Sequence, residues 1–464
     1  MKTPVEYFYE LSKIPRGSGN EKGVCDWLEA FAKDHGFEYY RDSENNILIK
    51  KPGIGRTVVL QGHSDMVCEK NEGVDHDFEK DPITIIEEFG HLIHADHTTL
   101  GADDGVSIAV MLSLLSDDSV TVPLECLVTS KEEIGLIGMS RFDLSKLEGR
   151  IMINLDSEDE GIATVSCSGG VRSDISLFFP AVETKKATYI MKVRGLYGGH
   201  SGEDIHKNRG NAITLTMTML SGIEDAEVVK IDGGSKDNAI PRECTCVFTS
   251  DHDDADEEVL SIAGAIRRGL CEEDKDFSVT VERTEADFAL EGATSAMLGL
   301  LLDLRLGVIE MNPDIPGLVK TSANLGVIRT VGDSIVFTIL SRSSDDKVID
   351  DLIEDIDSFA VSHGGCAAHS GRYPGWDFDK DSYVRDLYLN VYSDLFGRDA
   401  KYEGIHAGLE CGIVKSAIPD MDIISIGPDI KSPHTPDETL NGASLDRLYL
   451  TVLEMLRQIA ASLE

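Results

Sequence analysis

The chain has 464 residues, of which 41% are hydrophobic and 27% are charged, a composition typical of globular proteins whose length requires more than one core. Its formal net charge of −40, from 43 basic and 83 acidic residues, argues against a nucleic acid or an anionic membrane as a partner, because both bind basic surfaces. The chain opens without a signal-peptide pattern and has no apolar run long enough to span a bilayer, so we expect a cytoplasmic location with reduced thiols for the nine scattered cysteines.

The first part of the chain alternates helices and strands, as expected for an α/β domain. Apolar periodicity predicts two helices and then two short strands, over about residues 3–13, 20–35, 39–40 and 47–49. Residues 70–95 are mostly polar, with a hairpin predicted around Phe89-Gly90, and the sequence does not indicate their role. After Gly105 an apolar run predicts a largely buried helix with Asp104 at its N-cap.

Five stretches share one design, in which an apolar segment meets residues of metal-ligand type. Four predicted strands end on such residues, namely His63 and Asp65, Glu132 and Glu133, Asp156, and His434. In the fifth stretch, Asp103 and Asp104 stand where the buried helix begins. Ligand sites of open α/β sheets lie beyond the carboxyl ends of the strands, so we expect these side chains to meet. Two histidines and several carboxylates at one place indicate a metal centre.

The pattern of elements changes near residue 186. The order strand, helix, strand, strand, helix, strand follows, and much of it is repeated up to about residue 378. We interpret this region as an inserted α+β domain of two tandem ferredoxin-like units. The predicted organisation is a catalytic domain over residues 1–186 and 379–464, interrupted by a lid or substrate-binding domain over residues 187–378. The predicted fold class is α/β, with a mixed, mostly parallel sheet flanked by helices in the catalytic domain.

The candidate ligands match the needs of a two-metal site, which requires a bridging carboxylate and terminal histidine and carboxylate ligands. His63 and Asp156 would hold one ion, and Glu133 and His434 the other, with one aspartate between the ions. Asp65 lies on the same side of an extended chain as His63 and is placed to orient its ring. Each motif alone is also compatible with a loop histidine, a charged loop or a helix cap. Their combination at the strand ends favours the metal centre.

These motifs resemble those of the co-catalytic di-zinc peptidases related to carboxypeptidase G and aminoacylase. The resemblance extends from residue 63 to residue 438 and rests on His63-Ser-Asp65-Met-Val, Gly101-Ala-Asp-Asp-Gly105, Glu132-Glu133-Ile-Gly, Asp156, Gly199-His-Ser-Gly202, Asn238-Ala-Ile-Pro-Arg-Glu243, His406-Ala-Gly-Leu-Glu-Cys-Gly412 and His434-Thr-Pro-Asp-Glu438. It implies a catalytic domain of zinc-peptidase type that binds two divalent metal ions. Zn²⁺ is the expected metal, with Mn²⁺ or Co²⁺ as alternatives, because all three suit histidine and carboxylate ligands.

The resemblance implies a role for each residue of the metal centre. Asp103 would be the bridging ligand, joined to Asp104 by a cis peptide bond. Related enzymes often carry Asn at the second position, which leaves the choice between the two aspartates open. Adjacent Glu132 and Glu133 cannot both face one ion. Glu132 would then be the general base that activates a metal-bridging water, with Asp65 as a further catalytic residue.

Four residues outside the metal centre are implied to act on the substrate. His200 would stabilise the tetrahedral oxyanion, although it could instead cap a glycine-rich turn. Asn238 and Arg342 would bind the C-terminal carboxylate of the substrate, although Arg342 could instead be a surface residue at a strand end. His406 would contact the substrate or support the site from behind.

The function expected from the resemblance is that of a metal-dependent dipeptidase acting on unblocked dipeptides, including those that end in histidine. An N-acyl-amino-acid deacylase or a tripeptidase with the same site is the nearest alternative, and a requirement for a free amine separates the dipeptidase from the deacylase. A non-catalytic metal- or peptide-binding protein is a third interpretation. Such a protein would lack the general base or a metal ligand, whereas Glu132 and all five ligands are present here. The expected partner is a small peptide. A tandem lid could replace a partner subunit, which argues against an obligatory dimer and leaves a homodimer open.

Overall fold

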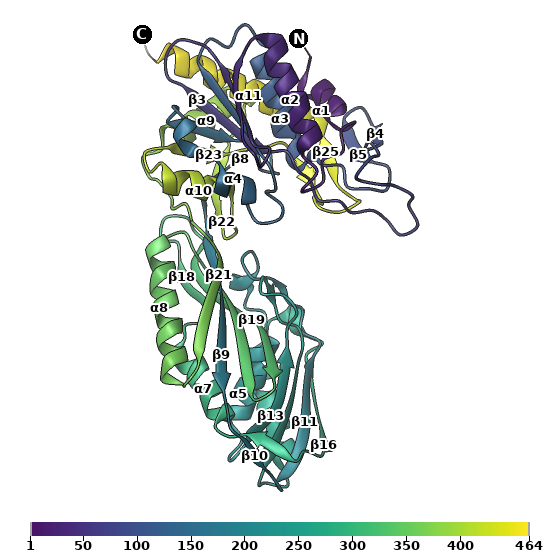
Figure 1. Ribbon diagram of the computed structural model, residues 1–464, viewed down its shortest axis with the longest axis vertical. Helices are drawn as coiled ribbons and strands as arrows, with labels where there is room; N and C mark the ends of the chain where they lie inside the picture. Colours follow the sequence, from purple (N-terminus) through teal and green to yellow (C-terminus); the bar gives the residue numbers. More distant parts are fainter. Residues whose placement is uncertain (1, 463–464) are drawn as a thin grey trace. The chain divides into compact units, whose positions relative to one another are not determined.

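The computed structural model describes residues 2–462, and the chain divides into two compact units (Figure 1). The first unit comprises Met1–Cys167, Trp376–Gly404 and Leu409–Glu464, and the second comprises Ser168–Gly375 and Ile405–Gly408. Within residues 2–462, we find no helix with the length and apolar character needed to cross a membrane.

The first unit is built on an eight-stranded mixed sheet in the order β1-β2-β6-β3-β7-β23-β8-β22. Its four central strands run parallel to one another, and they are β6 (Leu124–Thr129), β3 (Val58–His63), β7 (Ile151–Asn154) and β23 (Asp422–Ser425). The outer strands are β1 (Glu38–Arg41), β2 (Ile47–Lys51), β8 (Ile162–Cys167) and β22 (Lys401–Ile405), of which β1, β2 and β8 pair antiparallel. The central strands are nearly continuous apolar runs because both faces of a parallel sheet are covered.

Helices flank this sheet, as predicted. They are α1 (Pro4–Leu11), α2 (Lys22–His35), α3 (Ala102–Leu115), α4 (Ile137–Arg141), α9 (Tyr383–Phe396), α10 (Glu410–Ala417) and α11 (Gly442–Ala461), with a 3-10 turn η1 (Leu144–Lys146). The helix α2 ends at Gly36, whose φ of 68° lies in the left-handed region that glycine adopts without steric cost. The helix α3 is buried along nearly its whole length, which explains why its sequence is apolar on all sides.

A small four-stranded sheet in the order β24-β25-β5-β4 accompanies the main sheet of the first unit. Its strands are β4 (Ile85–Glu88), β5 (Leu92–Ala95), β24 (Ile430–Lys431) and β25 (Thr439–Asn441). The hairpin predicted around Phe89-Gly90 is confirmed, since β4 and β5 pair antiparallel across that turn. Because β5 also pairs with β25, the hairpin holds one end of the connection between β24 and β25 that carries His434. This is a structural role for residues 85–95, part of a segment whose role the sequence did not indicate.

The second unit contains an eleven-stranded sheet whose main path is β16-β11-β15-β13-β19-β20-β9-β21. The strands are β9 (Gly169–Phe178), β10 (Ala181–Glu183), β11 (Ala187–Arg194), β13 (Glu227–Gly233), β15 (Cys244–Ser250), β16 (Ser278–Thr284), β17 (Phe288–Leu290), β18 (Gly307–Met311), β19 (Val319–Val331), β20 (Ser334–Ser343) and β21 (Cys366–Tyr373). The helices are α5 (Ala212–Ser221), α6 (Ala255–Arg267), α7 (Ala293–Asp303) and α8 (Asp346–Ser362), with 3-10 turns η2 (Ile205–Lys207) and η3 (Glu272–Asp274). Buried residues of all four helices and of the sheet form one hydrophobic core. A separate two-stranded sheet pairs β12 (Gly199–His200) with β14 (Ala239–Ile240).

The two ferredoxin-like units expected in this region are present, but one is inserted into the other rather than following it. The strands β11, β13, β15 and β16 with α5 and α6 form one unit. The strands β19, β20 and β21 with α7 and α8 form the other, and its first strand is β9, which precedes the whole of the first unit. The second unit of the chain therefore begins at Ser168 and not at the expected residue 187, because β9 pairs along its length with β20 and β21. Its main segment ends at Gly375, close to the expected residue 378, and the short segment Ile405–Gly408 also belongs to it.

Candidate metal centre

The carboxyl ends of the central parallel strands deliver most of the candidate ligands to one edge of the sheet. His63 is the last residue of β3, and Asp156 follows β7 by two residues. Glu132 and Glu133 follow β6, whose last residue Thr129 is in register with His63. The sheet topology therefore brings these four side chains together, as the sequence predicted.

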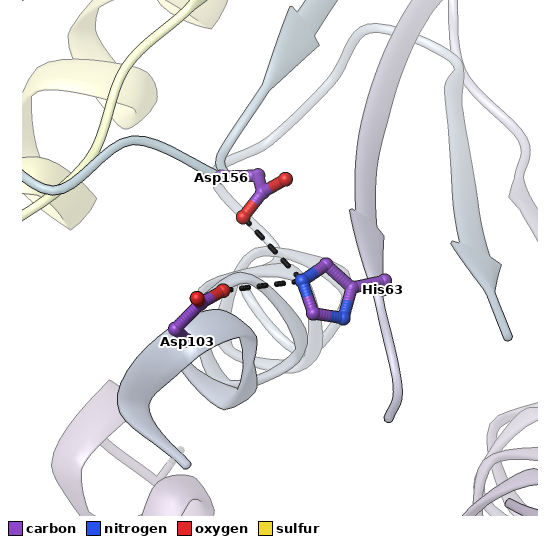
Figure 2. A group of neighbouring side chains, drawn as sticks. All are labelled: His63, Asp103 and Asp156. Carbon is purple, nitrogen blue, oxygen red and sulfur yellow. Dashed lines mark hydrogen bonds and ion pairs between the residues drawn. The ribbon is translucent and has the colours of Figure 1, made fainter. Parts of the chain in front are cut away.

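The five predicted metal ligands form two groups that share one aspartate. In the groups His63–Asp103–Asp156 and Asp103–Glu133–His434, the ligand-type atoms lie within 4.8 Å of one another. Asp103 and Asp156 both point at the ring of His63, with distances to its Nε2 atom of 3.1 Å and 3.5 Å (Figure 2). The Nε2 atom of His434 lies 2.8 Å from Asp103 Oδ2 and 3.1 Å from Glu133 Oε1. Asp103 thus directs one oxygen to each histidine.

The donor set fits a pair of divalent cations. Histidine nitrogen and carboxylate oxygen are the ligands that Zn²⁺, Mn²⁺ and Co²⁺ accept in proteins. The Oε1 atom of Glu133 is buried, and His434 is its nearest cationic group. Burial raises the pKa of Asp156 to about 6, and burial with neighbouring carboxylates raises the pKa of Glu132 well above its ordinary value. A buried cluster of like charges is stabilised by bound cations.

Asp103 and Asp104 differ in what they contact. The peptide bond between them is cis, as the family resemblance implied, and both residues depart from helical geometry at the start of α3. Asp104 Oδ2 accepts the backbone N–H of His63 at 3.0 Å, and its Oδ1 accepts that of Ser107 at 3.4 Å. Asp104 is therefore committed to backbone groups, which leaves Asp103 as the aspartate between the two histidines. The helix α3 begins earlier than predicted, with Gly101 rather than Asp104 at the N-cap.

Asp65 is fully buried and connects several parts of the centre. Its Oδ1 atom lies 3.4 Å from His63 Nδ1, on the side of the ring away from the ligand cluster. The same carboxylate accepts hydrogen bonds from Ser18 Oγ at 2.7 Å and from the backbone N–H groups of Glu132 at 3.0 Å and Glu133 at 3.3 Å. Asp65 thereby orients both the histidine ring and the backbone of the two glutamates.

Two residues that the sequence did not single out hold the loops of the centre. Glu438 accepts the four consecutive N–H groups of residues 100–103 at distances of 2.7 to 3.3 Å, and so fixes the backbone that carries Asp103. Arg16 is buried and donates to the carbonyl groups of Ser64, Asp65 and Gly101. Glu438 lies in the motif that starts at His434 and could have been noticed there, whereas nothing around Arg16 in the sequence indicates its position.

The predicted catalytic residue His200 and the three predicted substrate-binding residues belong to the second unit. The strand β12 carries His200, and Asn238 is exposed immediately before β14, the strand that pairs with β12. Arg342 lies in β20 and is only 6% exposed, so it is not the surface residue that was considered as an alternative. His406 lies in the short segment of the second unit formed by residues 405–408, and not in the first unit, where the expected boundaries put it.

His200 and His406 are both held in the neutral form near Arg342. Burial, followed by the charge of Arg342, lowers the pKa of His200, and the same causes lower the pKa of His406 to about 3. The Nδ1 atom of His200 accepts the backbone N–H of Glu203 at 3.2 Å, so its proton is on Nε2, available as a donor. The Nε2 atom of His406 is hydrogen-bonded to Ser322 Oγ at 2.7 Å. Arg342 donates to Tyr373 Oη at 2.6 Å, and its buried Nε atom has no partner.

Comparisons with known proteins identify proteins to which this chain is similar. A protein-family model described as a peptidase dimerisation domain matches residues 191–270. The chain is 36% identical to the cytosol non-specific dipeptidase of Escherichia coli (strain K12), over 98% of this chain and 97% of that protein. The crystal structure of aminoacylhistidine dipeptidase from Vibrio alginolyticus matches with a TM-score of 0.91 and 33% identity, over 98% and 96% of the two chains. The aminopeptidase PepT from Bacillus cereus ATCC 10987 has a TM-score of 0.58 and 15% identity, which shows a similar fold alone.

Proposed function

Because the chain belongs to the cytosol non-specific dipeptidase family of metallopeptidases, we propose that it hydrolyses unblocked dipeptides. The observation that carries this proposal is the pair of ligand groups joined at Asp103, with Glu132 and Asp65 beside them. Dipeptides that end in histidine are included, since the similar structure from Vibrio alginolyticus is that of an aminoacylhistidine dipeptidase.

His63, Asp103 and Asp156 would hold one divalent ion, and Asp103, Glu133 and His434 the other. When bound, the two ions polarise the scissile carbonyl and make water a stronger nucleophile at neutral pH. We propose Zn²⁺ as the natural metal.

Glu132 is proposed as the group that moves the proton. Its Oε2 atom lies 4.0 Å from His63 Nε2, which places the carboxylate at the rim of the ligand cluster. There it can accept the proton of the attacking water and then deliver it to the departing amine nitrogen, which leaves as the neutral amine. The hydrogen bond from its backbone N–H to Asp65 holds Glu132 in place during both transfers.

The second unit is proposed to bind the substrate. His200 presents a neutral ring with a proton on Nε2, the form needed to donate a hydrogen bond to the oxyanion. Arg342 is a buried cation with an unpartnered N–H group, which suits the terminal carboxylate of a dipeptide, and exposed Asn238 is proposed to assist it. His406 is proposed to support these substrate-binding residues and not to contact the substrate, because its ring is already hydrogen-bonded to Ser322.

Two wider properties are part of the proposal. We propose a cytoplasmic location, supported by the cytosolic dipeptidase relative. We also propose a homodimer, supported by the match of residues 191–270 to a peptidase dimerisation domain, and light scattering of the purified protein tests it.

The test of the function is hydrolysis of a dipeptide panel and its N-acetylated counterparts by metal-stripped protein, before and after addition of Zn²⁺, Mn²⁺ or Co²⁺. We expect metal-restored cleavage of the free dipeptides alone. Cleavage of the acetylated set would instead indicate a deacylase. Failure to cleave either set by protein that holds two metal ions would refute the proposed activity.

A further inference from the structure

A row of buried polar side chains crosses the centre of the parallel sheet just beneath the candidate metal centre. Gln61 in β3 is in register with Asn154 in β7, which is in register with Ser425 in β23, and all three are fully buried. Side chains two apart on a strand face the same way, so Gln61 lies on the same side of the sheet as His63. Polar groups in an otherwise apolar sheet interior are costly unless they are hydrogen-bonded.

Hydrogen bonds connect this polar row from end to end. Asn154 Nδ2 donates to Gln61 Oε1 at 2.6 Å, and Ser425 Oγ donates to Asn154 Oδ1. The same Asn154 oxygen accepts the backbone N–H of Asp156 at 3.2 Å. The row therefore reaches the backbone of a candidate ligand directly.

Glu410, the first residue of α10, lies at the end of this row. Its side chain is 1% exposed, and its Oε2 atom accepts hydrogen bonds from Gln61 Nε2 and from Thr129 Oγ1, the latter at 2.7 Å. Thr129 Oγ1 also lies 3.2 Å from the carbonyl oxygen of Gly62, next to His63. Glu410 thus contacts the end of β3, next to His63, and the end of β6, which leads to Glu132 and Glu133.

The environment of Glu410 is unfavourable for a carboxylate that serves stability alone. Its Oε1 atom is buried without a hydrogen-bond partner, and in residues 2–462 no basic side chain forms an ion pair with it. Burial raises the pKa of Glu410 to about 8. An apolar side chain of similar volume would avoid these costs, so an acid at this place points to a function.

We propose that Glu410 is a positioning residue for the His63–Asp156 half of the metal centre. Through Thr129 and Gln61 it fixes the ends of β6 and β3, and through Gln61 and Asn154 it fixes the backbone of Asp156. Glu410 touches neither metal nor substrate in this role. The inference rests on the proposed function of the five residues as metal ligands.

The proposal predicts an asymmetric defect. In Glu410→Ala, we expect one of the two metal ions to bind about 10- to 100-fold more weakly, as is usual when a group that orients ligands is lost. The other ion, held by Glu133 and His434, should be weakened less, since Glu410 contacts Thr129 but Glu133 lies four residues further along the chain. In the metal-loaded variant, kcat should fall about tenfold or more with KM little changed, because alignment and not substrate binding is affected.

Two further variants separate positioning from folding. Glu410→Gln can keep its oxygen toward Gln61 and Thr129, so it should restore most of the metal affinity. Glu125→Gln is the matched control, since Glu125 is a buried acid in β6 whose carboxylate accepts the N–H groups of Glu148 and Gly149, away from the site. It should lower stability and leave both metal affinities intact. If Glu410→Ala fails to fold, Gln61→Met removes the same link and should give the same metal defect.

Three measurements decide the outcome. They are metal titration followed by calorimetry, steady-state activity, and unfolding followed by tryptophan fluorescence. Wild-type affinity for both ions in Glu410→Ala or Gln61→Met, with only a loss of stability, would overturn the proposal. Equal weakening of both ions would overturn it too, because the polar row supports one half of the centre. Wild-type protein that binds two ions and cleaves no dipeptide would refute the proposed function, yet the metal affinities would still test the role of Glu410.

Discussion

Glu132 and Glu133 are neighbours in the chain, and ligand-type atoms of both lie within 4.8 Å of each other and of His63, but the histidine with which each forms its ion pair differs. Glu133 Oε1 lies 3.1 Å from His434 Nε2, whereas Glu132 Oε2 lies 4.0 Å from His63 Nε2. If Glu132 moves the proton and Glu133 binds metal, Glu132→Gln should lower kcat by about 10²- to 10⁴-fold with two metal ions still bound. The matched variant Glu133→Gln should lose metal. Elemental analysis beside steady-state kinetics checks both, and metal loss in Glu132→Gln would identify Glu132 as a ligand.

The variant His200→Ala tests what one side chain of the second unit contributes to catalysis. Its neutral ring carries the proton on Nε2, so removal of that donor in His200→Ala should lower kcat by about 10²- to 10³-fold. The metal content should not change, because the candidate ligands all belong to the first unit. Activity close to that of the wild type would rule out the role in oxyanion stabilisation. It would indicate instead that His200 only caps its glycine-rich turn.

A site residue could be predicted from the sequence only where its own local pattern places it at the site. His63, Asp156 and the two glutamates follow apolar strands, and the rule for strand ends is enough to bring them together. Arg16 and Glu438 act on backbone groups of distant loops, and Glu410 acts through side chains of two strands. Glu438 and Glu410 stand within motifs that the sequence showed, but no local pattern records these contacts, so only the folded structure could identify what the three residues hold.

At the scale of elements, Glu160 joins two helices to the loop between β7 and β8. Arg447 of α11 holds its carboxylate with two hydrogen bonds of 2.6 Å, and Tyr392 of α9 and Arg398 donate to the same group. The side chain of Glu160 is 5% exposed, but that of Arg398 is half exposed, so solvent weakens that part of the interaction. We expect Glu160→Gln to lower the free energy of unfolding of the first unit by about 1–2 kcal/mol.

The effect of Glu160→Gln should depend on pH. Burial alone would raise the pKa of Glu160, but the hydrogen bonds from Arg447, Tyr392 and Arg398 outweigh burial and lower it. A carboxyl whose pKa is lowered by folding contributes stability above its unfolded pKa of about 4.3 and loses that contribution as the pH falls through the folded value. The difference between wild type and variant should therefore be full at pH 7 and shrink below about pH 4.3 in denaturant titrations. Glu148→Gln, at an exposed salt bridge, is the control and should change little. A difference that stays constant down to low pH would contradict an ionic role.

Elements were predictable where the chain is locally periodic. The helix α2, the hairpin of β4 and β5 and the strands of the parallel sheet follow from apolar spacing and turn residues. The nesting of the two ferredoxin-like units could not be predicted in this way, because β9 pairs with β20 and β21, which come more than 150 residues later in the chain. A strand looks the same in sequence whichever sheet it joins, so the boundary was expected too late.

For the whole molecule, the sequence was sufficient for the fold class and the two-part organisation, since an α/β pattern is interrupted by an α+β pattern. The two units differ in what they contain. All five candidate ligands and both tryptophans, Trp27 and Trp376, lie in the first unit, while the second holds His200, Arg342 and His406. Trp27 lies well inside the first unit and Trp376 is the first residue after the boundary, so tryptophan fluorescence reports chiefly the unfolding of the first unit and can separate its response to metal.

Metal addition should stabilise the two units unequally. An ion that binds only the folded state raises stability by about 4 kcal/mol at a free concentration of about 1,000 times its Kd, which corresponds to a rise in Tm of about 8–16 °C for a unit of this size. We expect Zn²⁺ added to metal-stripped protein to shift the transition seen by tryptophan fluorescence, while a second calorimetric transition of the other unit stays in place. His434→Ala, which removes one ligand, should reduce the shift. An equal shift of the second transition would show that metal also binds the second unit, where His252, Asp254 and Glu258 form another group of ligand-type residues. Absence of any shift would refute the assignment of the five ligands.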